Sequence, residues 1–318
     1  MTSIRSLSST PHRRPGMLGV HSVRDFHFSV PDLSVADRFY KAFGLDVRSD
    51  GDRLDLFTHG HEQRWGSIGE GIRKKFGFIS FGIYEEDEHP FKRRLEELSI
   101  DRMDPPAGFD SNGIWFRDLD GNPIEIRVAE KTAPDEKAIV SNPSGLPNLR
   151  NAPSRSQAPL VYPRRLAHIL LFTRDISKTI AFYERVLGMR LSDRSGEIIA
   201  FMHGIHGSDH HMVAFAKSDA PGLHHLSWDV GSINDVGFGA KQMVEKGYVD
   251  GWGLGRHVLG SNYFHYVRDP WGSYSEYSCD IDYIPADVDW IGQDHPPEDS
   301  FYVWGPNPPE DFAFNHEA

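Results

Sequence analysis

The alternation of apolar and polar residues predicts the same strand and helix twice along the chain. Segment 26–45 begins with a short apolar strand, turns at a Pro-Asp pair and continues as an amphipathic helix that ends at a glycine. Segment 169–189 repeats this order with an Arg-Asp turn. Asp32 and Asp175 stand where each helix begins, and aspartate is a favoured N-cap residue. The two segments therefore predict equivalent strand–turn–helix units.

The far ends of the two repeats match as well. Segment 116–126 (FRDLDGNPIEI) parallels segment 267–277 (VRDPWGSYSEY), and this alignment places Glu125 opposite Glu276. A match at both ends of a long segment indicates an internal duplication with small changes in the loops.

Each half predicts one order of elements: a strand, a helix, several short alternating strands, a second helix near 91–99 or 232–246, and further strands that end at the glutamate. Strands and helices in this order predict an α+β fold with curved mixed sheets. The expected organisation comprises a flexible leader (1–19), an N-terminal domain (20–130), a Pro-, Ser- and Asn-rich linker (131–163), a C-terminal domain (164–285) and a Pro-rich aromatic tail (286–318) that packs back on the C-terminal domain.

Composition narrows the possible functions. The 318 residues are enough for two domains, and a net charge of −12 argues against nucleic acid or an anionic membrane surface as a partner. No apolar run approaches the roughly 20 residues of a membrane-spanning helix, and the N-terminus lacks the apolar core of a secretory signal. The single cysteine, Cys279, excludes an intramolecular disulfide framework. These features predict a soluble globular protein of a reducing cytoplasm.

Three side chains in the second half suggest a metal centre. His168 lies in RLAHILLF, His225 in GLHHLSWDV and Glu276 in RDPWGSYSEYS, all strand-like strings. Two imidazoles and one carboxylate form the facial triad of non-haem Fe(II) oxygenases, which leaves positions open for O2 and a substrate. A carboxylate inside a strand costs several kcal/mol unless it is paired or bound to a metal. Each residue alone has an ordinary structural explanation, so the hypothesis depends on their joint placement.

Strand alternation selects between the two adjacent histidines. Successive side chains of a strand point to opposite faces, so His225 shares a face with Ser227 and Asp229. His224 belongs to the other, more apolar face, which is expected to pack on a helix. His225 is therefore the predicted ligand, and His224 is not.

The second half resembles the type I extradiol catechol dioxygenases of the vicinal oxygen chelate superfamily. The strings that carry the resemblance are Leu-His-His ending at His225 and Y-x-x-D-P-x-G-x-x-x-E from Tyr266 to Glu276. The resemblance covers about residues 20–285. It implies a two-domain duplication of paired βαβββ modules, with one Fe(II), or alternatively Mn(II), held only in the C-terminal domain by His168, His225 and Glu276.

The resemblance also implies three catalytic residues. His211, in the string HHMVAF, matches the family's acid–base histidine, although a one-residue gap would select His210 instead. His257 and Tyr266 match a histidine and a tyrosine that hydrogen-bond the bound substrate oxygen and help to hold its charge. The implied reaction opens a catechol ring beside the two hydroxyls and incorporates both atoms of O2.

The first half lacks most of these residues. Phe78 stands where the second half has His225, Trp115 replaces Tyr266, and Asp25 falls near the His168 position, or His27 if the alignment slips by two. Only Glu125 keeps its type. The first half is therefore expected to be a structural module without metal.

The substrate is less constrained by the sequence. Trp252, Phe264 and the aromatic tail favour an apolar catechol, whereas Arg256 and Arg268 leave a carboxylated catechol open. The pocket walls are expected from loops near 190–206 and 247–262 and from the tail. A homo-oligomer is expected from the habit of the family.

Three other functions remain open. A 4-hydroxyphenylpyruvate-type dioxygenase shares the triad but usually ends in a long C-terminal helix, which this Pro-rich tail does not predict. A glyoxalase-type enzyme generally takes ligands from two modules. A non-catalytic module that binds an aromatic ligand would be expected to lose a metal ligand, and none is lost.

Overall fold

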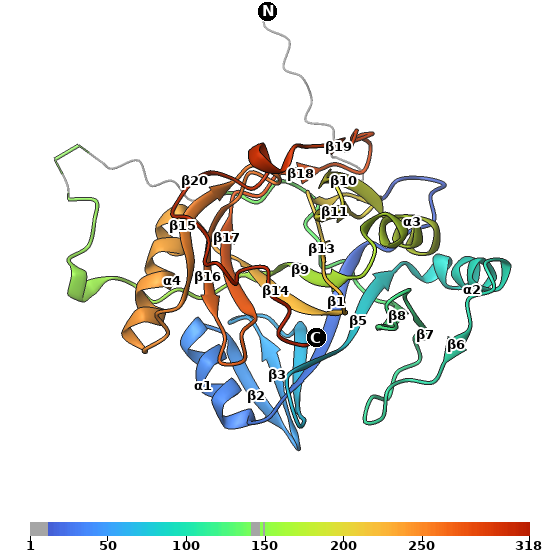
Figure 1. The fold of residues 1–318 in the computed structure, drawn as a ribbon, viewed down its shortest axis with the longest axis horizontal. Helices are drawn as coiled ribbons and strands as arrows, with labels where there is room; N and C mark the ends of the chain where they lie inside the picture. The colour runs from blue at the N-terminus through green and yellow to red at the C-terminus, as the bar shows by residue number, and fades with distance from the viewer. Residues whose placement is uncertain (1–11, 141–146, 149) are drawn as a thin grey trace, which may run out of the picture.

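The computed structural model describes residues 12–140, 147–148 and 150–318, and two large curved sheets dominate it (Figure 1). The first sheet has eight strands in the order β2-β3-β4-β1-β5-β8-β7-β6. Its elements are β1 (Ser22–Val30), α1 (Leu33–Phe43), β2 (Asp46–Asp50), β3 (Arg53–Phe57), β4 (Arg64–Glu70), β5 (Lys75–Ile83), η1 (Glu85–Asp87), α2 (Glu88–Glu97), β6 (Arg102–Met103), β7 (Ile114–Arg117) and β8 (Pro123–Val128).

The second sheet has ten strands in the order β19-β10-β11-β13-β9-β14-β17-β16-β15-β20. After η2 (Arg155–Gln157) come β9 (Arg165–Thr173), α3 (Ile176–Leu187), β10 (Arg190–Ser195), β11 (Ile199–His203), β12 (Ser208–Asp209), β13 (Val213–Lys217), β14 (Gly222–Asp229), α4 (Ile233–Glu245), β15 (Gly251–His257), β16 (Tyr263–Arg268), β17 (Tyr274–Cys279), β18 (Tyr283–Ile284), β19 (Gln293–Asp294), η3 (Pro297–Asp299) and β20 (Tyr302–Trp304). Strands β12 and β18 form a separate two-stranded sheet.

The two sheets are built from four copies of one unit. Each copy is a strand, a helix and three strands: β1 to β4, β5 to β8, β9 to β13 without β12, and β14 to β17. Within a unit the first and last strands pair in parallel, and between units the two first strands pair antiparallel at the centre of the sheet. The predicted α+β duplication of βαβββ modules with mixed sheets is confirmed.

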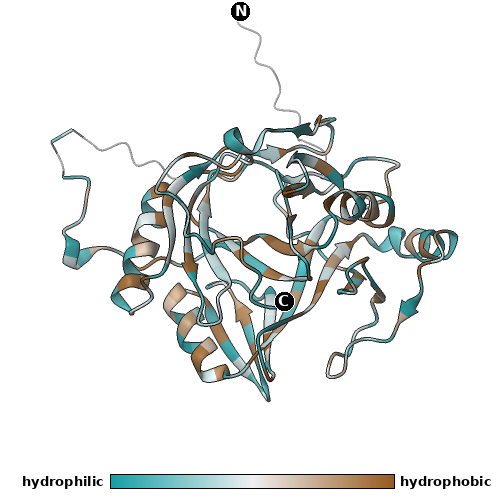
Figure 2. Cartoon of the chain, viewed as in Figure 1, coloured by the Kyte–Doolittle hydropathy of each residue, from teal (hydrophilic) through white to brown (hydrophobic). Residues whose placement is uncertain are grey.

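The predicted helix boundaries follow from local chemistry. The Asp32 carboxylate accepts hydrogen bonds from the Ser34 and Val35 amides, and Asp175 caps α3 through the Lys178 amide. Both helices end at a glycine with positive φ, at +100° for Gly44. Figure 2 shows both apolar and polar residues along the helices, as expected where one face of a helix packs on a sheet.

The cores of the two sheets are continuous with each other. Phe43 of α1 stacks on Tyr277 of β17 with ring centroids 3.9 Å apart, and the Tyr277 hydroxyl donates to the Phe43 carbonyl at 2.7 Å. Nearby, the buried Lys74 ammonium pairs with the buried Asp269 carboxylate. The N-terminal half therefore packs directly against the strand that carries Glu276.

The start of the chain differs in part from the expected flexible leader. Residues 1–11 lie outside the described residues, but the chain from His12 onward is held by contacts. The Arg13 guanidinium pairs with Asp87 at 2.7 Å, and the Arg14 amide donates to His206 Nδ1 at 3.2 Å. Residues 12–19 are therefore anchored on the fold.

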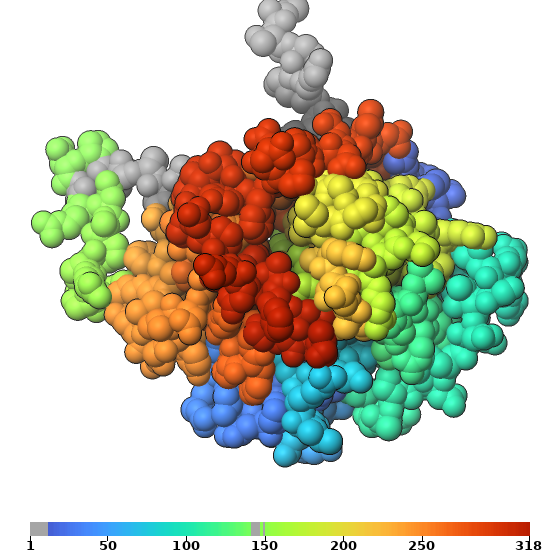
Figure 3. All heavy atoms as spheres, in the orientation of Figure 1, coloured from blue at the N-terminus to red at the C-terminus, as the bar shows by residue number. Residues whose placement is uncertain are grey.

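The C-terminal tail lies across the second sheet. Strand β19 pairs with β10 at one edge of that sheet and β20 pairs with β15 at the other, so the tail spans its full width. Figure 3 shows this segment in red over the front of the sheet, with a hollow between it and the yellow strands.

Among the described residues, no helix has the length and apolar character needed to cross a membrane.

Candidate active site

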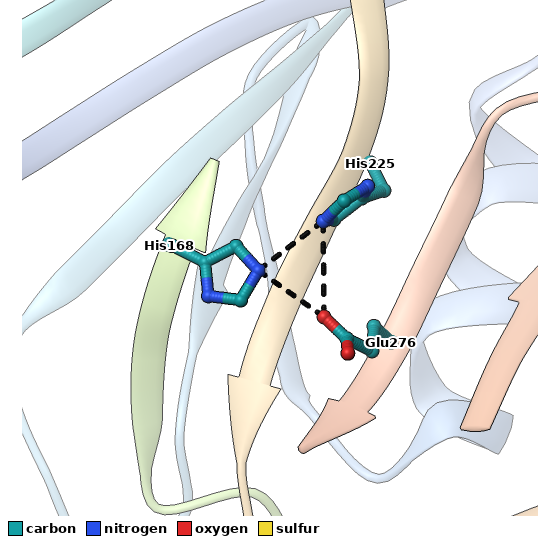
Figure 4. Close-up of side chains that lie close together, drawn as sticks. All are labelled: His168, His225 and Glu276. Carbon is teal, nitrogen blue, oxygen red and sulfur yellow. Dashed lines mark hydrogen bonds and ion pairs between the residues drawn. The ribbon is translucent and has the colours of Figure 1, made fainter. Parts of the chain in front are cut away.

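Three neighbouring central strands bring the predicted metal ligands together. In the ladders of β14, Ser227 lies opposite both His168 of β9 and Glu276 of β17. His225 stands two residues before Ser227 on the same strand, so its side chain points to the same face. Figure 4 shows the two imidazoles and the carboxylate converging.

The distances between the donor atoms suit one metal ion. His168 Nε2 lies 3.2 Å from His225 Nε2 and 3.2 Å from Glu276 Oε2, and His225 Nε2 lies 3.7 Å from the same oxygen. Donors placed about 2.1 Å from a metal at right angles lie about 3 Å apart. Glu276 is fully buried, and within the described part of the chain its Oε2 receives no hydrogen bond. An orphaned buried carboxylate oxygen facing two imidazoles fits a cation.

The equivalent place in the first sheet has the same register but different residues. Ser80 lies opposite both Asp25 and Glu125, as Ser227 lies opposite His168 and Glu276, and Phe78 takes the place of His225. The Asp25 carboxylate is bound by Arg64. Asp25 and not His27 therefore aligns with His168, and the first half presents a phenylalanine where a second nitrogen ligand would be needed.

The structure places His211 beside the triad and His210 behind it. The ring centroid of His211 lies 4.1 Å from that of His168, whereas His210 Nε2 bonds the Asp193 carboxylate at 2.9 Å. The two Nδ1 atoms of His210 and His211 lie 3.0 Å apart. Burial, with smaller contributions from neighbouring histidines, holds the pKa of His211 well below its usual value. Of the two alternatives, His211 is the one that lines the cavity.

His257 and Tyr266 form a hydrogen-bonded pair on the other side of the triad. His257 Nε2 lies 2.9 Å from the Tyr266 hydroxyl, and His257 Nδ1 lies 2.9 Å from the carbonyl of Phe301 in the tail. The Tyr266 ring stands edge-on to His225 at 5.1 Å. Burial, followed by the nearby Glu276 carboxylate, raises the pKa of the Tyr266 hydroxyl well above its usual value, so this hydroxyl keeps its proton.

His224 is not where strand alternation placed it. The expectation was an apolar face packed on a helix, but a bulge between Leu223 and His225 breaks the alternation there. The His224 ring instead packs against Phe312 of the tail, with centroids 4.9 Å apart, and lines the same cavity as His225. His224 Nδ1 also lies 2.7 Å from His225 Nδ1, and the prediction that His224 packs on a helix was wrong.

A cavity of about 360 Å³ opens beside the triad, and most of its wall is apolar. Its described lining includes His168, His211, His225, His257 and Tyr266 at one end and Leu170, Ile198, Ile199, Phe201, Leu259, Phe301, Pro308, Pro309 and Phe312 around the rest. Segments near 198–201 and 257–262 and the tail therefore supply walls, as expected.

The two arginines considered for substrate recognition lie elsewhere. Arg268 is paired with Asp311 and donates to the Tyr274 hydroxyl, and Arg256 donates to the Ser261 carbonyl and the Tyr263 hydroxyl. Neither lines the cavity in the described structure. This removes the reason for expecting a carboxylated substrate.

The expected aromatic walls also change. Trp252 and Phe264 pack on each other with centroids 4.3 Å apart, and both lie behind His257 rather than on the cavity surface. The aromatic wall comes instead from Phe201, Phe301 and Phe312.

Sequence reasoning missed two supports of the site. Asn262 donates to Glu276 Oε1 at 3.2 Å and to the Ser278 hydroxyl at 2.9 Å, which fixes the carboxylate. The carbonyls of Phe301 and Phe312 bind His257 and His224. Backbone carbonyls leave no signal in side-chain patterns, so only the aromatic character of the tail pointed toward the site.

A family model matches the C-terminal half of the chain, and one relative matches almost all of it. Residues 165–277 match the family model described as the glyoxalase/bleomycin resistance protein/dioxygenase superfamily. Metapyrocatechase 2 of Cupriavidus necator is 46% identical over 311 residues, covering 98% of this chain and 97% of that protein. An iron-dependent extradiol dioxygenase of Rhodococcus jostii is 28% identical over 153 residues, covering 44% of this chain and 50% of its own length.

The name of a third relative specifies manganese in place of iron. It is a manganese-dependent 2,3-dihydroxybiphenyl 1,2-dioxygenase of Geobacillus genomosp. 3, 26% identical over 88 residues, which are 28% of each chain.

Solved structures show the same fold at low identity. An extradiol ring-cleaving dioxygenase from B. fuscum superposes with a TM-score of 0.74 at 19% identity, covering 95% of this chain and 84% of its own. The Mn(II)-bound glyoxalase from Novosphingobium aromaticivorans has a TM-score of 0.71 at 22% identity, covering 91% and 93%.

Proposed function

We propose that this chain, which belongs to the extradiol catechol dioxygenases of the glyoxalase/bleomycin resistance protein/dioxygenase superfamily, cleaves a catechol ring beside its hydroxyls at the centre formed by His168, His225 and Glu276. The observation that carries the assignment to these residues is the convergence of their three donor atoms within 4.8 Å at the end of a largely apolar cavity.

The triad would hold Fe(II), as the name of the Rhodococcus relative suggests, with Mn(II) as the alternative named for the Geobacillus relative. When bound, such an ion supplies a centre at which a catechol and O2 meet and exchange electrons without an organic cofactor. Asn262 fixes one oxygen of Glu276, which leaves the other directed at His168 and His225.

Three residues would serve the substrate around this centre. His211 is the proposed acid–base residue: its Nδ1 is engaged by His210, so proton exchange with a catechol hydroxyl falls to Nε2. Tyr266 keeps its proton and donates it to His257 Nε2 at 2.9 Å, so its oxygen would accept a hydrogen bond from a catechol hydroxyl and help to position it. The apolar wall would exclude water from the reacting ring.

The substrate is proposed to be a catechol with an unsubstituted or apolar ring. The charged side chains among the described lining residues, besides the histidines, are Lys217 and Glu310. Both are exposed, and the Lys217 ammonium donates to the Arg174 carbonyl. A buried carboxylate without a partner costs several kcal/mol, and each 1.4 kcal/mol is a factor of ten. The kcat/KM for 3,4-dihydroxybenzoate should therefore be at least about 100-fold below that for catechol.

The test of the proposed function is reconstitution of metal-free protein with Fe(II) without oxygen, followed by a panel of monocyclic and bicyclic catechols and then air. Ring fission beside the hydroxyls gives a yellow product that absorbs visible light. The His225→Ala variant is the matched control and should give neither bound metal nor colour. A colourless reaction with every catechol, from protein that has bound Fe(II), would contradict the proposal.

Other members of the superfamily are the alternatives. A glyoxalase-type reaction would need no O2, so oxygen consumption measured with the same panel separates it from ring cleavage. A non-catalytic ligand-binding module would bind catechol without consuming either compound. The 46% identity to metapyrocatechase 2 across almost the whole chain favours the dioxygenase.

The remaining assignments are proposals about the whole protein. We propose an N-terminal structural domain (20–130), a linker (131–163), a C-terminal catalytic domain (164–285) and the tail (286–318), in a cytoplasmic homo-oligomer. The single cysteine, Cys279, is buried and free, which suits a reducing compartment. Light scattering on purified protein measures the oligomeric state, and a monomer at micromolar concentration would contradict that part.

A further inference from the structure

A chain of hydrogen bonds leads from the tail to a metal ligand. The Phe312 carbonyl lies 2.8 Å from His224 Nε2, His224 Nδ1 lies 2.7 Å from His225 Nδ1, and His225 Nε2 faces the triad. Both histidines and Phe312 are buried, so water does not compete for these contacts. The three groups form one continuous relay from the backbone of the tail to the centre.

The Phe312 carbonyl, at the tail end of the relay, determines which atom donates in each hydrogen bond. A carbonyl only accepts, so His224 Nε2 carries a hydrogen that it donates to Phe312. A neutral His224 then has its lone pair at Nδ1. His225 Nδ1 must therefore be the donor across the 2.7 Å contact, because one of the two nitrogens has to carry the hydrogen. This leaves the lone pair of His225 on Nε2, the atom that faces His168 and Glu276.

We propose that His224 is a positioning residue that fixes the tautomer and orientation of His225, and that the tail, through the Phe312 carbonyl, is part of the metal centre. This rests on the proposed function of the triad. Partners of a ligating histidine's outer nitrogen orient the ring and raise its basicity, and losing them typically weakens metal binding about 10- to 100-fold. His224 itself is not a ligand, because both its nitrogens are engaged.

A second contact supports the same role for the tail. The Phe301 carbonyl accepts from His257 Nδ1 at 2.9 Å, which directs His257 Nε2 to the Tyr266 hydroxyl. Two carbonyls from one segment thus orient two histidines that line the cavity. Between them, Pro308 and Pro309 line the cavity, and proline restricts the backbone that presents the carbonyls.

The test compares metal affinity rather than activity. Mn(II) is titrated into metal-free full-length protein, and the dissociation constant is measured for the wild type, His224→Phe and His224→Asn. Phenylalanine keeps the ring but removes both hydrogen bonds, and we expect the dissociation constant to rise about 10- to 100-fold. The asparagine amide oxygen occupies the place of Nδ1 and can still accept from His225, so His224→Asn should remain within about fivefold of the wild type.

The control variant is His265→Phe. His265 is a histidine of β16, the strand that pairs with β17. Burial lowers its pKa to about 4, yet its side chain does not line the cavity among the described residues. Its Mn(II) affinity should equal that of the wild type. Equal weakening in His224→Phe and His224→Asn would assign the effect to packing and overturn the proposal, as would an unchanged affinity in His224→Phe.

A measurement on the wild type covers the case in which His224→Phe does not fold. Long-range ¹H–¹⁵N correlation spectra of histidine-labelled, metal-free protein distinguish the two neutral tautomers. We expect the hydrogen on Nε2 in His224 and on Nδ1 in His225, and the opposite assignment for either ring would overturn the proposal. If the wild type binds no Mn(II) or Fe(II) at all, the proposed metal centre itself fails, which is a separate outcome.

Discussion

Burial sets the energetics of the three proposed ligands. Glu276 is fully buried and His168 and His225 are each 3% exposed, so without a cation the carboxylate oxygen facing them lacks a charge partner. A ligand that binds only the folded state stabilises it by an amount that grows with the logarithm of its concentration, about 2.7 kcal/mol at 100 times the dissociation constant. Metal binding at the proposed centre would therefore be coupled to folding.

Removal of the metal should accordingly lower thermal stability. We expect the Tm of metal-free protein to rise by several degrees when Fe(II) or Mn(II) is added anaerobically at about 100 times its dissociation constant. Differential scanning calorimetry measures the shift. In His225→Ala the same additions should leave the Tm unchanged, and a metal-dependent shift that survives in this variant would place the metal elsewhere.

Substitution of His211 should have a different effect from substitution of a triad residue. The His211→Ala variant removes the proposed acid–base group but none of the three donors, so we expect metal content to remain near the wild-type level while kcat falls about 10²- to 10⁴-fold. Metal analysis and steady-state oxygen consumption measure the two quantities. Loss of metal with retained turnover per bound metal would show that His211 is a ligand and would contradict the assignment.

At the same scale, sequence reasoning named side chains that the structure brings close together. The three donors and His211, His257 and Tyr266 lie around one cavity. It misplaced His224, because a bulge shifts the side chains that follow it and period-two reasoning assumes an unbroken strand. The bulge leaves no composition signal, since neither Leu223 nor His225 is a residue that marks one.

At the scale of elements, the helix ends of the repeat are where sequence and structure agree best. Capping aspartates and terminal glycines act through local backbone geometry, which a short segment determines by itself. Gly44 also has a tertiary role. A Cβ at this position would lie 2.1 Å from the Val161 carbonyl oxygen, so the end of α1 approaches the linker segment just before β9 too closely for any side chain.

Substitution of Gly44 should therefore lower the unfolding free energy by more than the strain of its positive φ alone. Gly44→Ala adds a collision to a positive φ, whereas Gly51→Ala, at φ +65°, meets nothing within 4 Å. The left-handed conformation alone costs about 1–2 kcal/mol for a non-glycine residue. We expect Gly51→Ala to lose about that much unfolding free energy and Gly44→Ala clearly more, measured by urea denaturation. Equal losses would show that the chain near Val161 yields freely.

At the scale of the whole molecule, the duplication lets equivalent positions of the two halves be compared. The ladders of the two sheets have the same register, so Asp25, Phe78 and Glu125 occupy the places of His168, His225 and Glu276. The repeat was visible in sequence because both copies keep their core and turn residues. The tail has no counterpart in the first half, so the repeat carried no information about its path.

Buried histidines outside the site should make the whole fold sensitive to acid. Burial lowers the pKa of His21 and His27 to about 4 and that of His203 to about 3. In the unfolded chain these groups titrate near 6.5, so the unfolded state binds protons first as the pH falls. Stability is therefore complete above about pH 6.5 and declines toward pH 4, by at most about 1.4 kcal/mol per pH unit for each histidine.

The measurement is the unfolding free energy in urea at pH 7.5, 6.0 and 5.0. The His21→Gln variant cannot titrate at this position, so its unfolding free energy should fall less steeply with decreasing pH than that of the wild type. The difference between the two slopes corresponds to at most one bound proton. An identical slope in both proteins would mean that His21 keeps its ordinary pKa in the fold.

The last residues of the chain carry a practical consequence for anyone who produces this protein. The Glu317 carboxylate accepts from the Phe76 amide at 2.7 Å and from the Leu223 amide at 3.1 Å, one residue before His224 and in a different sheet from Phe76. A purification tag or fusion partner attached after Ala318 would begin two residues after Glu317. Affinity handles therefore belong at the other terminus, and preparations tagged at the C-terminus are expected to contain less metal per chain for reasons unrelated to the chemistry of the centre.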